Sequence, residues 1–332
     1  MFIGQNNLFI IKLMNYYLRL GITGGCNLRC RFCNPNGHMN SNNDLSTNDW
    51  KEIIKAGSTC GIKEIHYTGG EPTIRRDLAE IIQYANELGY TDQSITTNGI
   101  IFEEKAEELF KAGLNRANIS LSTLSSKQYS YYSNSPEDNY PKVINSIKIA
   151  TKLFNLVKIN CVVMKENFDS IESIVEFAQE HNAVLRLLEL QNFAETPGLE
   201  AIDFNKSHVS KQEIVNKLKK ISELTPTKVN GKNAVVEYYN LSGFKNPIGI
   251  IAPHSAGYQC RKDKCETIRI SAQGVISYCA MNIDKNNVLA NKNYDEKLEM
   301  MKKIIELKNL LHEKKDYPSH HIPPYSIMRF NK

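Results

Sequence analysis

Three cysteines stand close together in the segment CNLRCRFCNP, residues 26–35. Cys26, Cys30 and Cys33 are separated by three residues and then by two. A closed structural zinc site needs four ligands, so these thiols would require a distant fourth group such as His38. Three thiolates instead suit a cubane [4Fe–4S] cluster in which one iron has no protein ligand. An open iron can bind a small molecule, so the spacing favours a catalytic iron–sulfur centre.

A second group of three cysteines lies near the C-terminus, in YQCRKDKCETIRISAQGVISYCAMN. Cys260 and Cys265 are separated by four residues, and Cys265 and Cys279 by thirteen. The intervening sequence predicts a hairpin that turns at residues 272–274 and brings the third thiol back to the first two. A second open [4Fe–4S] cluster is the leading interpretation. A zinc site completed by His254 is the alternative.

The composition is that of an ordinary globular protein. The 332 residues include 41 basic and 36 acidic residues, for a formal net charge of +5. This mild charge does not favour nucleic acid as a partner, but it suits an anionic small substrate if the charges converge. The N-terminal apolar run LFIIKLM is too short to cross a membrane. We therefore expect a cytoplasmic protein, in which clustered thiols indicate metal or catalysis rather than disulfides.

Strands and helices alternate along the first half of the chain. The patterns predict strands at 16–23, 64–69, 94–99, 116–122, 157–164 and 183–190. They predict helices at 46–61, 77–89, 101–113, 141–154 and 170–182. This order implies a parallel sheet with right-handed crossovers. Six repeats fall short of a closed eightfold barrel, so we expect an α/β fold with a partial (β/α)6 barrel.

The predicted barrel occupies residues 14–192, and a smaller C-terminal extension occupies residues 193–332. Within the extension, residues 193–210 look irregular, 210–224 predict a helix and 225–233 a turn-rich connection. Short strands, the second cysteine group and a long periodic helix at 294–315 follow. Sites in barrel folds form at the C-terminal ends of the strands. The first cysteine loop, TGGEP and TTNG all stand at such ends.

The first cysteine loop, followed by TGGEP and TTNG in that order, resembles the CX3CX2C loop of radical S-adenosylmethionine (SAM) enzymes. This resemblance implies that the open iron chelates SAM. An electron, supplied by a donor such as flavodoxin or ferredoxin, then cleaves the sulfonium and yields a 5′-deoxyadenosyl radical. The radical abstracts a hydrogen atom from the substrate, while the protein positions and shields the reactants.

The resemblance also implies roles for individual residues. Cys26, Cys30 and Cys33 would hold the first cluster. Phe32 would lie near the adenine of SAM. The other implied SAM contacts are Gly69, Gly70 and Glu71 at its amino group, together with Thr97 and Ser120.

From LRLGIT to SYCAMN, the chain is similar to the molybdenum-cofactor branch of these enzymes, whose founding activity is GTP 3′,8-cyclase. In that branch the C-terminal cluster leaves an iron free to touch the purine. Basic residues hold the triphosphate, because charge-assisted contacts suit phosphate. The matching substrate-binding candidates are Arg19, Lys165, Arg186 and Arg269. Arg19 and Arg186 stand in apolar strands, where an unpaired charge is costly.

Several positions depart from the branch. Glu64 and His66 occupy positions that are usually basic, and Thr267 replaces a usual arginine. The first gap of the second cysteine group has four residues rather than two. The sequence ends in MRFNK rather than in the Gly-Gly tail of the cyclase. A glutamate facing a triphosphate would be repulsive.

The leading hypothesis is therefore a radical SAM enzyme with two [4Fe–4S] clusters and a substrate near the second cluster. The substrate would be a nucleotide, another small anionic molecule or a natural-product peptide, with no nucleic-acid or membrane partner. One alternative is GTP 3′,8-cyclase itself. Another, of a different class, is a non-catalytic zinc-binding protein.

Overall fold

The computed structural model describes residues 16–33, 41–192, 201–229, 236–255, 266–277 and 286–313. The strands of these residues form one sheet in the order β11-β10-β1-β2-β3-β4-β5-β6-β9-β8-β7. Its six central strands are parallel neighbours. They are β1 (Tyr17–Thr23), β2 (Glu64–Gly69), β3 (Asp92–Thr97), β4 (Arg116–Ser120), β5 (Leu156–Val163) and β6 (Val184–Glu189). The predicted α/β fold with a six-stranded partial barrel is confirmed.

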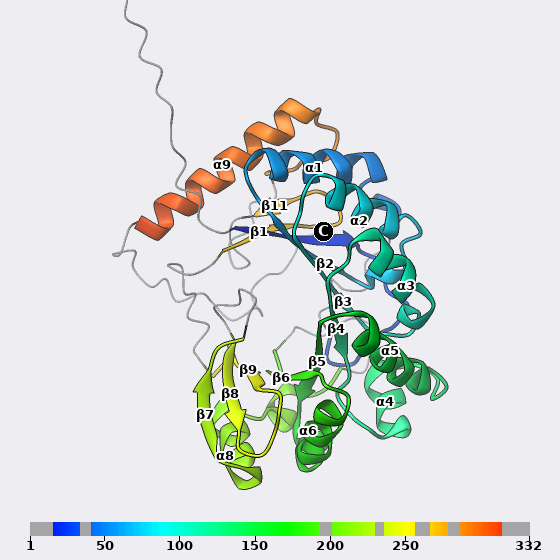
Figure 1. Cartoon of the computed structure of the whole chain (residues 1–332), viewed down its shortest axis with the longest axis vertical. Coiled ribbons are helices and arrows are strands. Elements are labelled where there is room, and N and C mark those ends of the chain that lie inside the picture. The colour runs from blue at the N-terminus through cyan, green and yellow to red at the C-terminus, as the bar shows by residue number, and fades with distance from the viewer. Residues whose placement is uncertain are drawn as a thin grey trace, which may run out of the picture.

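Helices cover the outer face of this curved sheet (Figure 1). They are α1 (Thr47–Thr59), α2 (Leu78–Glu87), α3 (Phe102–Ala112), α5 (Asn139–Leu153) and α6 (Ile171–Glu180). A capping box is present at the start of α1, because Ser46 Oγ accepts from the Asp49 N–H and Asp49 accepts from the Ser46 N–H. Short 3-10 turns are η2 (Ser41–Asn43), η3 (Pro72–Ile74) and η4 (Lys165–Ser170).

The central strands are apolar toward the helices and polar toward the barrel interior. In β1, Leu18, Leu20 and Ile22 are fully buried, whereas Tyr17 and Arg19 are only partly buried. Successive side chains of a strand point to opposite faces, so the apolar set forms the core under the helices. The other set lines the space that the strands enclose. The hydrophobic effect thus stabilises the outer layer, and the interior remains available for polar chemistry.

The C-terminal part of the chain extends the sheet at both edges. β9 (Ile248–Ile251) pairs in parallel with β6, and β8 (Glu237–Leu241) and β7 (Leu224–Thr227) follow in antiparallel order. At the other edge, β10 (Thr267–Ile270) pairs in parallel with β1, and β11 (Ile276–Ser277) pairs with β10. The predicted hairpin is therefore present. The predicted boundary between the barrel and the C-terminal extension, at residues 192 and 193, adjoins residues that the structure does not describe, so it stays a prediction.

The elements that the sequence patterns missed include α4 and β7. α4 (Ser126–Ser133) reads SKQYSYYS, which lacks an aliphatic period, although Ser125 accepts from Gln128 N–H and caps its start. Strand β7 lies in a stretch predicted to be turn-rich, and it contains Pro226. Proline lacks a donor N–H, and it is tolerated here because β7 is the edge of the sheet.

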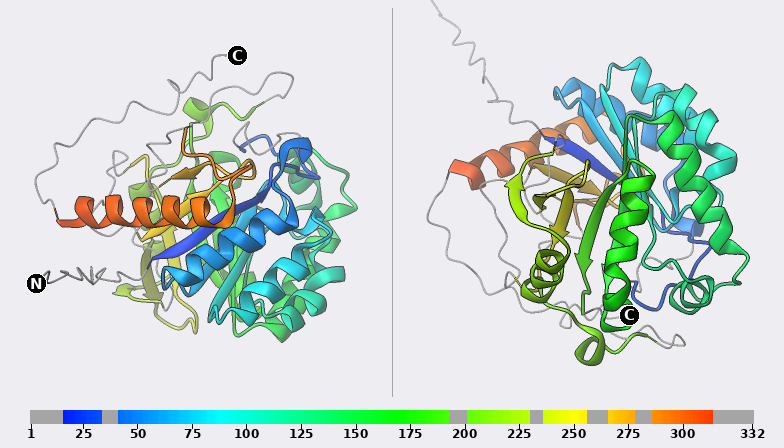
Figure 2. Two further views of the ribbon diagram at one scale, coloured as in Figure 1. Left: turned by 90° about the horizontal axis from the view of Figure 1, so that it is seen from above. Right: turned by 60° about the horizontal axis from the view of Figure 1, so that its bottom comes forward.

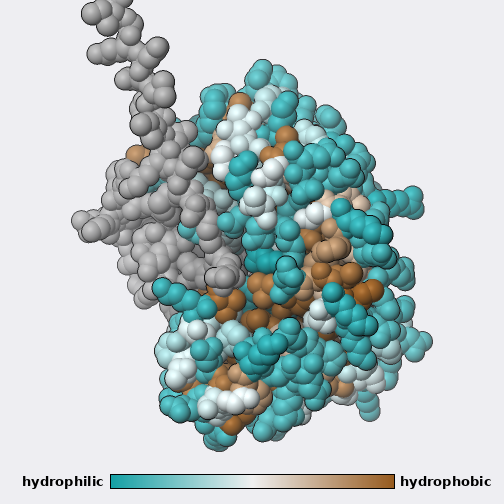
Figure 3. All heavy atoms as spheres, viewed as in Figure 1, coloured by the Kyte–Doolittle hydropathy of each residue, from teal (hydrophilic) through white to brown (hydrophobic). Residues whose placement is uncertain are grey.

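The remaining helices are α7 (Phe204–Ser207), α8 (Lys211–Ile221) and α9 (Tyr294–Glu313). Figure 2 shows α9 beside α1, although the two are far apart in sequence. Lys297 of α9 is buried between them and donates to Asp49 Oδ1 at 2.7 Å and Glu52 Oε2 at 2.6 Å. The face of the molecule seen in Figure 3 is largely hydrophilic, with hydrophobic residues gathered near its middle. Among the described residues, no helix is long and apolar enough to cross a bilayer.

Candidate functional site

The first cysteine group lies in the loop that leaves the C-terminal end of β1. Cys26, Cys30 and Cys33 are partly buried and form no disulfide. Leu28 N–H donates to Cys26 Sγ at 3.4 Å, and Asn98 Nδ2 lies 4.0 Å from the same sulfur. Partly buried thiols with N–H donors beside them fit the ligand set of an iron–sulfur cluster, because such donors stabilise thiolate charge.

The Cys26 and Cys30 thiols are poor acids. Burial raises the pKa of Cys26 to about 11 and raises the pKa of Cys30 well above its ordinary value. The nearby thiols and Glu71 raise both values further. Each thiolate therefore needs a positive partner, which a bound metal centre provides.

The two glycines of TGGEP fit against the cysteine loop itself. A Cβ atom on Gly69 would lie 2.3 Å from Thr23 O, and one on Gly70 would lie 2.0 Å from Gly25 O. Gly70 N–H donates to Thr23 O, and Glu71 N–H donates to Gly25 O, both at 2.8 Å. The glycines are therefore required by the chain's own backbone. Their predicted contact with SAM stays a prediction.

Glu71 is buried and joins the ends of β2 and β3. Its Oε1 accepts from Thr73 N–H, Thr73 Oγ1 and Thr97 Oγ1 at 3.0, 2.6 and 2.7 Å. Its Oε2 accepts from Asn98 N–H at 2.6 Å. Burial raises the pKa of Glu71, and these hydrogen bonds oppose the shift. TGGEP and TTNG are thus joined by direct hydrogen bonds. From the sequence, residues of the two segments were expected only to contact the same SAM molecule.

The other predicted SAM contacts lie at the same end of the barrel. Thr97 ends β3 and is buried, and Ser120 ends β4 and is partly buried. Phe32 packs edge-on against Tyr132 of α4, with ring centroids 6.5 Å apart. The structure therefore brings the predicted cluster and SAM residues to the C-terminal ends of β1 to β4.

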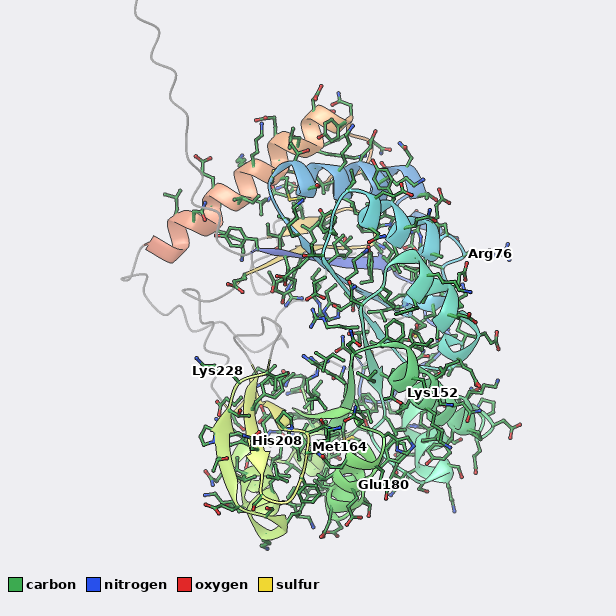
Figure 4. All side chains as sticks on the ribbon, viewed as in Figure 1. Arg76, Lys152, Met164, Glu180, His208 and Lys228 are labelled. Carbon is green, nitrogen blue, oxygen red and sulfur yellow. The ribbon has the colours of Figure 1, made fainter. Side chains whose placement is uncertain are left out.

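A second concentration of functional groups fills the barrel interior nearer the N-terminal ends of the strands. Arg269, Arg19 and His66 occupy paired positions on β10, β1 and β2. A cavity lies beside this row. Its lining residues are Tyr17, Glu64, Ile65, His66, Ser94, Arg116, Asn118, Lys158 and Arg186. Figure 4 shows nitrogen-bearing side chains pointing into the space between the strands.

Arg186 has neutral hydrogen-bond partners in this interior. Arg186 is buried and donates to Asn160 Oδ1 at 2.8 Å and Asn118 Oδ1 at 2.9 Å. Burial lowers the pKa of Arg186. Burial, followed by repulsion from Arg269, lowers the pKa of Arg19 to about 10. These shifts indicate positive charges held together in a place where an anion would be stabilised.

Lys158 is a residue of this cavity that sequence reasoning missed. It is 2% exposed, and its Nζ lies 3.4 Å from the Tyr238 hydroxyl. Burial, then repulsion from Arg186 and Arg116, lowers the pKa of Lys158 to about 7. The signal was the alternation in VKINCVV, which places Lys158 on the polar face opposite the apolar residues.

Lys165, the lysine chosen from the sequence, lies elsewhere. It is exposed at the start of η4, beyond the C-terminal end of β5, and it does not line the cavity. Arg269 is aligned with Arg19 but is absent from the cavity lining. Among the predicted substrate contacts, the cavity and its adjoining row therefore bring together Arg19, Arg186 and Arg269 without Lys165.

Two of the positions that depart from the branch, Glu64 and His66, line the cavity. His66 Nε2 lies 2.7 Å from Thr96 Oγ1, and its pKa is well below the ordinary value because of burial and the surrounding arginines. His66 is therefore neutral at physiological pH. Glu64 contributes a carboxylate to the same lining. Arg116, another lining residue, is paired with the Asp92 carboxylate at 2.7 Å.

Cys260, Cys265 and Cys279 lie outside the described residues, as does His38. The chain that leads toward Cys260 is described as far as Ser255, whose N–H donates to both carboxylate oxygens of buried Glu189. His208, labelled in Figure 4, also contacts Glu189 at 2.9 Å. The His254 ring packs against Phe204 and His208. Its proposed part in a zinc site stays a prediction.

Two protein families match this chain, one over each half. Residues 20–178 match the radical SAM superfamily, and residues 183–318 match Molybdenum Cofactor Synthesis C. A GTP 3′,8-cyclase of Clostridium acetobutylicum is 34% identical over 325 residues, covering 95% of each chain. A GTP 3′,8-cyclase of Aliarcobacter butzleri is 34% identical over 308 residues, covering 88% of this chain and 89% of the relative.

Solved structures show the same fold at lower identity. Streptococcus suis SuiB bound to S-adenosylmethionine is 20% identical, with a TM-score of 0.60. The match covers 84% of this chain and 64% of SuiB. The similarity to SuiB therefore concerns the fold alone.

Proposed function

This chain belongs to the radical SAM superfamily, in the branch of the GTP 3′,8-cyclases, and we propose on that basis that its substrate is a small anionic molecule of the nucleoside phosphate class. It is an enzyme, and its cofactors are two [4Fe–4S] clusters and SAM. The alternative of a non-catalytic zinc-binding protein is therefore wrong.

Cys26, Cys30 and Cys33 would hold the cluster that binds SAM. Bound there, the cluster and SAM would supply radical chemistry for removing a hydrogen atom from the substrate. The described residues form the walls around the substrate. Buried Glu71 joins TGGEP to TTNG, and the strands curve around the interior of the partial barrel. Such an enclosure excludes water and keeps a reactive species from side reactions.

The observation that carries the substrate proposal is the charge of the barrel interior. Among the described residues, Arg19, Arg186 and Lys158 have no carboxylate within ion-pair distance. Buried charges without a counter-charge are costly, and an anionic ligand would offset that cost. Guanidinium groups are suited to phosphate because they donate in a planar, two-pronged geometry. A phosphate group placed here would leave the rest of the substrate pointing toward the cluster end.

The lining also favours a substrate other than GTP. Glu64 places a negative charge in the cavity, and neutral His66 adds no positive charge. Both reduce the attraction for a triphosphate relative to an all-basic lining. We therefore propose a ligand with fewer negative charges than GTP. GTP 3′,8-cyclase activity is the second candidate, favoured by 34% identity over 95% of the chain to a named cyclase.

The test uses full-length protein, reconstituted with iron and sulfide and reduced without oxygen. It is mixed with SAM alone, or with SAM and one of GTP, GDP and GMP, which carry successively less charge. 5′-Deoxyadenosine and any new nucleotide product are measured, with Cys30→Ala as the inactive control. Stimulation by a less charged nucleotide but not by GTP supports the proposal. A cyclised GTP product would instead establish the second candidate.

A further inference from the structure

Tyr238 enters the barrel interior from the C-terminal part of the chain. It lies on β8, which is separated from the barrel strand β6 by β9 alone (Figure 1). The register places Tyr238 opposite Gly249 of β9, and Gly249 opposite Arg186 of β6. Residues at paired positions of neighbouring strands point to the same face of a sheet. Tyr238 and Arg186 therefore share one face, with only a glycine between them.

Gly249 leaves the room that the Tyr238 ring fills. A Cβ atom at this position would lie 2.8 Å from Tyr238 Cε1 and 3.1 Å from Tyr238 Cδ1. The ring therefore lies across the glycine, where a larger side chain would displace it. Tyr238 is 7% exposed, so the packing around it restricts the ring. A tyrosine held in this way presents its hydroxyl beyond β9, on the side of the barrel.

The Tyr238 hydroxyl lies beside two cations of the cavity wall. Lys158 Nζ, on β5, donates to this hydroxyl at 3.4 Å. Burial raises the pKa of Tyr238, whereas the charge of Arg186 and a hydrogen bond from it oppose the rise. Lys158 and Arg186 both line the cavity. Because charged ammonium and guanidinium groups can only donate, the tyrosine oxygen serves as their acceptor.

This contact leaves Lys158 able to bind a ligand. Among the described residues, Tyr238 is the hydrogen-bond partner of the Lys158 ammonium. A lysine ammonium has three donors, so two remain for an anion in the cavity. A side chain that is held in place before binding loses less freedom when the anion arrives, which raises the affinity.

We propose that Tyr238 is a positioning residue, whose hydroxyl oxygen holds the Lys158 ammonium beside Arg186 at the cavity wall and so increases the affinity for the anionic ligand. Lys158 and Arg186 contact the ligand, and Tyr238 acts through Lys158. Strand β8 of the C-terminal part thereby contributes to a site whose other walls belong to the barrel. The inference rests on the proposed function, in which this cavity binds the anionic group of the substrate.

The experiment measures sulfate binding by calorimetry, with the full-length protein reconstituted with iron and sulfide and without SAM. Tyr238→Phe removes the hydroxyl and keeps the ring over Gly249. The dissociation constant for sulfate is expected to rise about three- to tenfold, as for the loss of one hydrogen bond. Tyr239→Phe is the matched control, because the Tyr239 hydroxyl donates to the exposed Glu237 at 2.9 Å. This control should bind sulfate as the wild type does.

A double-mutant cycle separates positioning of Lys158 from a general effect on packing. If Tyr238 acts through Lys158, Tyr238→Phe should leave the dissociation constant unchanged in a Lys158→Met background. An equal loss of affinity in both backgrounds would overturn the proposal. So would an unchanged dissociation constant in Tyr238→Phe alone.

The pH dependence of sulfate binding gives a second readout. Sulfate keeps its charge across the neutral range, so a decline in affinity with rising pH follows the loss of the Lys158 proton. Tyr238→Phe should show this decline at a lower pH than wild type, because the ammonium has lost an acceptor that favours its charged form. The other titratable or charged groups around Lys158 are unaltered in this variant; they are Tyr17, Glu64, His66, Asp92, Arg116 and Arg186.

The two proposals fail in different ways. A decline at the same pH in Tyr238→Phe and wild type would overturn the role of Tyr238, while the cavity remained the anion site. A Lys158→Met variant that binds sulfate as tightly as wild type would instead refute the proposed function of the cavity, and the role of Tyr238 with it.

Discussion

Arg19 on β1 lies directly opposite Arg269 on β10, so that two guanidinium groups stand on neighbouring parallel strands. Both residues are partly buried, and His66 is paired with Arg19 on the other side. Like charges at facing positions of a sheet are destabilising. The two facing arginines therefore lower the stability of the folded protein. A bound anion would neutralise part of their charge and restore that stability. Charged groups in such perturbed surroundings are common at binding sites.

Substitution of Lys158 should weaken substrate binding, whereas substitution of Lys165 should not. Lys158→Met removes a buried cation from the cavity lining, and Lys165→Met removes an exposed one outside it. We expect the dissociation constant for an anionic ligand to rise at least about tenfold in Lys158→Met, since charge-assisted hydrogen bonds contribute about 1.5–3 kcal/mol. Calorimetry with GTP, GMP and sulfate checks this. Equal losses in the two variants would contradict the assignment of the cavity.

The depressed pKa of Lys158 predicts a pH dependence of stability in the apo protein. Its folded-state pKa of about 7 lies below the ordinary value of 10.5, so the folded protein holds this lysine neutral between the two. The unfolded chain binds more protons in that interval, and the free energy of unfolding therefore rises with pH there. Wild type should gain melting temperature relative to Lys158→Met from pH 7 to 9. A difference that is constant across this interval would argue that Lys158 keeps its charge.

The same residue predicts proton uptake on ligand binding. An anion favours the charged form of Lys158 and raises its pKa from about 7. At pH 8 the binding of phosphate should take up part of a proton, which calorimetry in buffers of different ionisation enthalpy measures. Lys158→Met should abolish that uptake while Lys165→Met retains it.

Gly70→Ala should disturb the first cysteine loop. The added Cβ would lie 2.0 Å from Gly25 O, so the loop or the strand end must move. The expected cost is about 1–3 kcal/mol, as for other overpacked positions, with lower iron content after reconstitution. Gly21→Ala in β1 is the matched control, because its nearest neighbour would lie at 3.4 Å. Denaturant unfolding and iron assays of the two variants should differ clearly.

Substitutions in the two cysteine groups should affect different steps, SAM cleavage for the first group and product formation for the second. Cys30→Ala should form no 5′-deoxyadenosine, because it removes a ligand that we propose for the cluster that binds SAM. Cys265→Ala should still cleave SAM but form no product, because we propose that Cys265 serves only the second centre. Cys60→Ala, a partly buried residue at the end of α1, serves as the control. Normal product formation by Cys265→Ala would refute a catalytic role for the second group.

The sequence predicted what depends on local pattern. The six parallel strands and their helices follow from apolar periodicity, and the cysteine spacing indicated the iron–sulfur site. α4 was missed because its tyrosines and serines carry no aliphatic stripe, and β7 because proline marks both turns and edge strands. Lys158 was passed over in favour of Lys165, since the choice depends on which end of β5 faces the cavity. The pairing of β1 with β10 could not be predicted, because no local signal specifies a partner so distant in sequence.

The pairing of β1 with the distant β10 has a consequence for folding during synthesis on the ribosome. Tyr17 and Thr267, whose hydroxyl groups are 2.6 Å apart, are separated by 250 positions in the chain. At about 5–20 residues per second, a ribosome needs roughly 12–50 seconds to deliver the partner strand. Until then, β1 is an open edge of an unfinished sheet, and β6 is another until β9 is made, so both can pair with other nascent chains. Inward-pointing charges are a known safeguard on such edges, and Arg19 and Arg186 are the charges that these two strands carry there. The residues that we propose to bind a ligand in the mature enzyme would thus also discourage aggregation during synthesis.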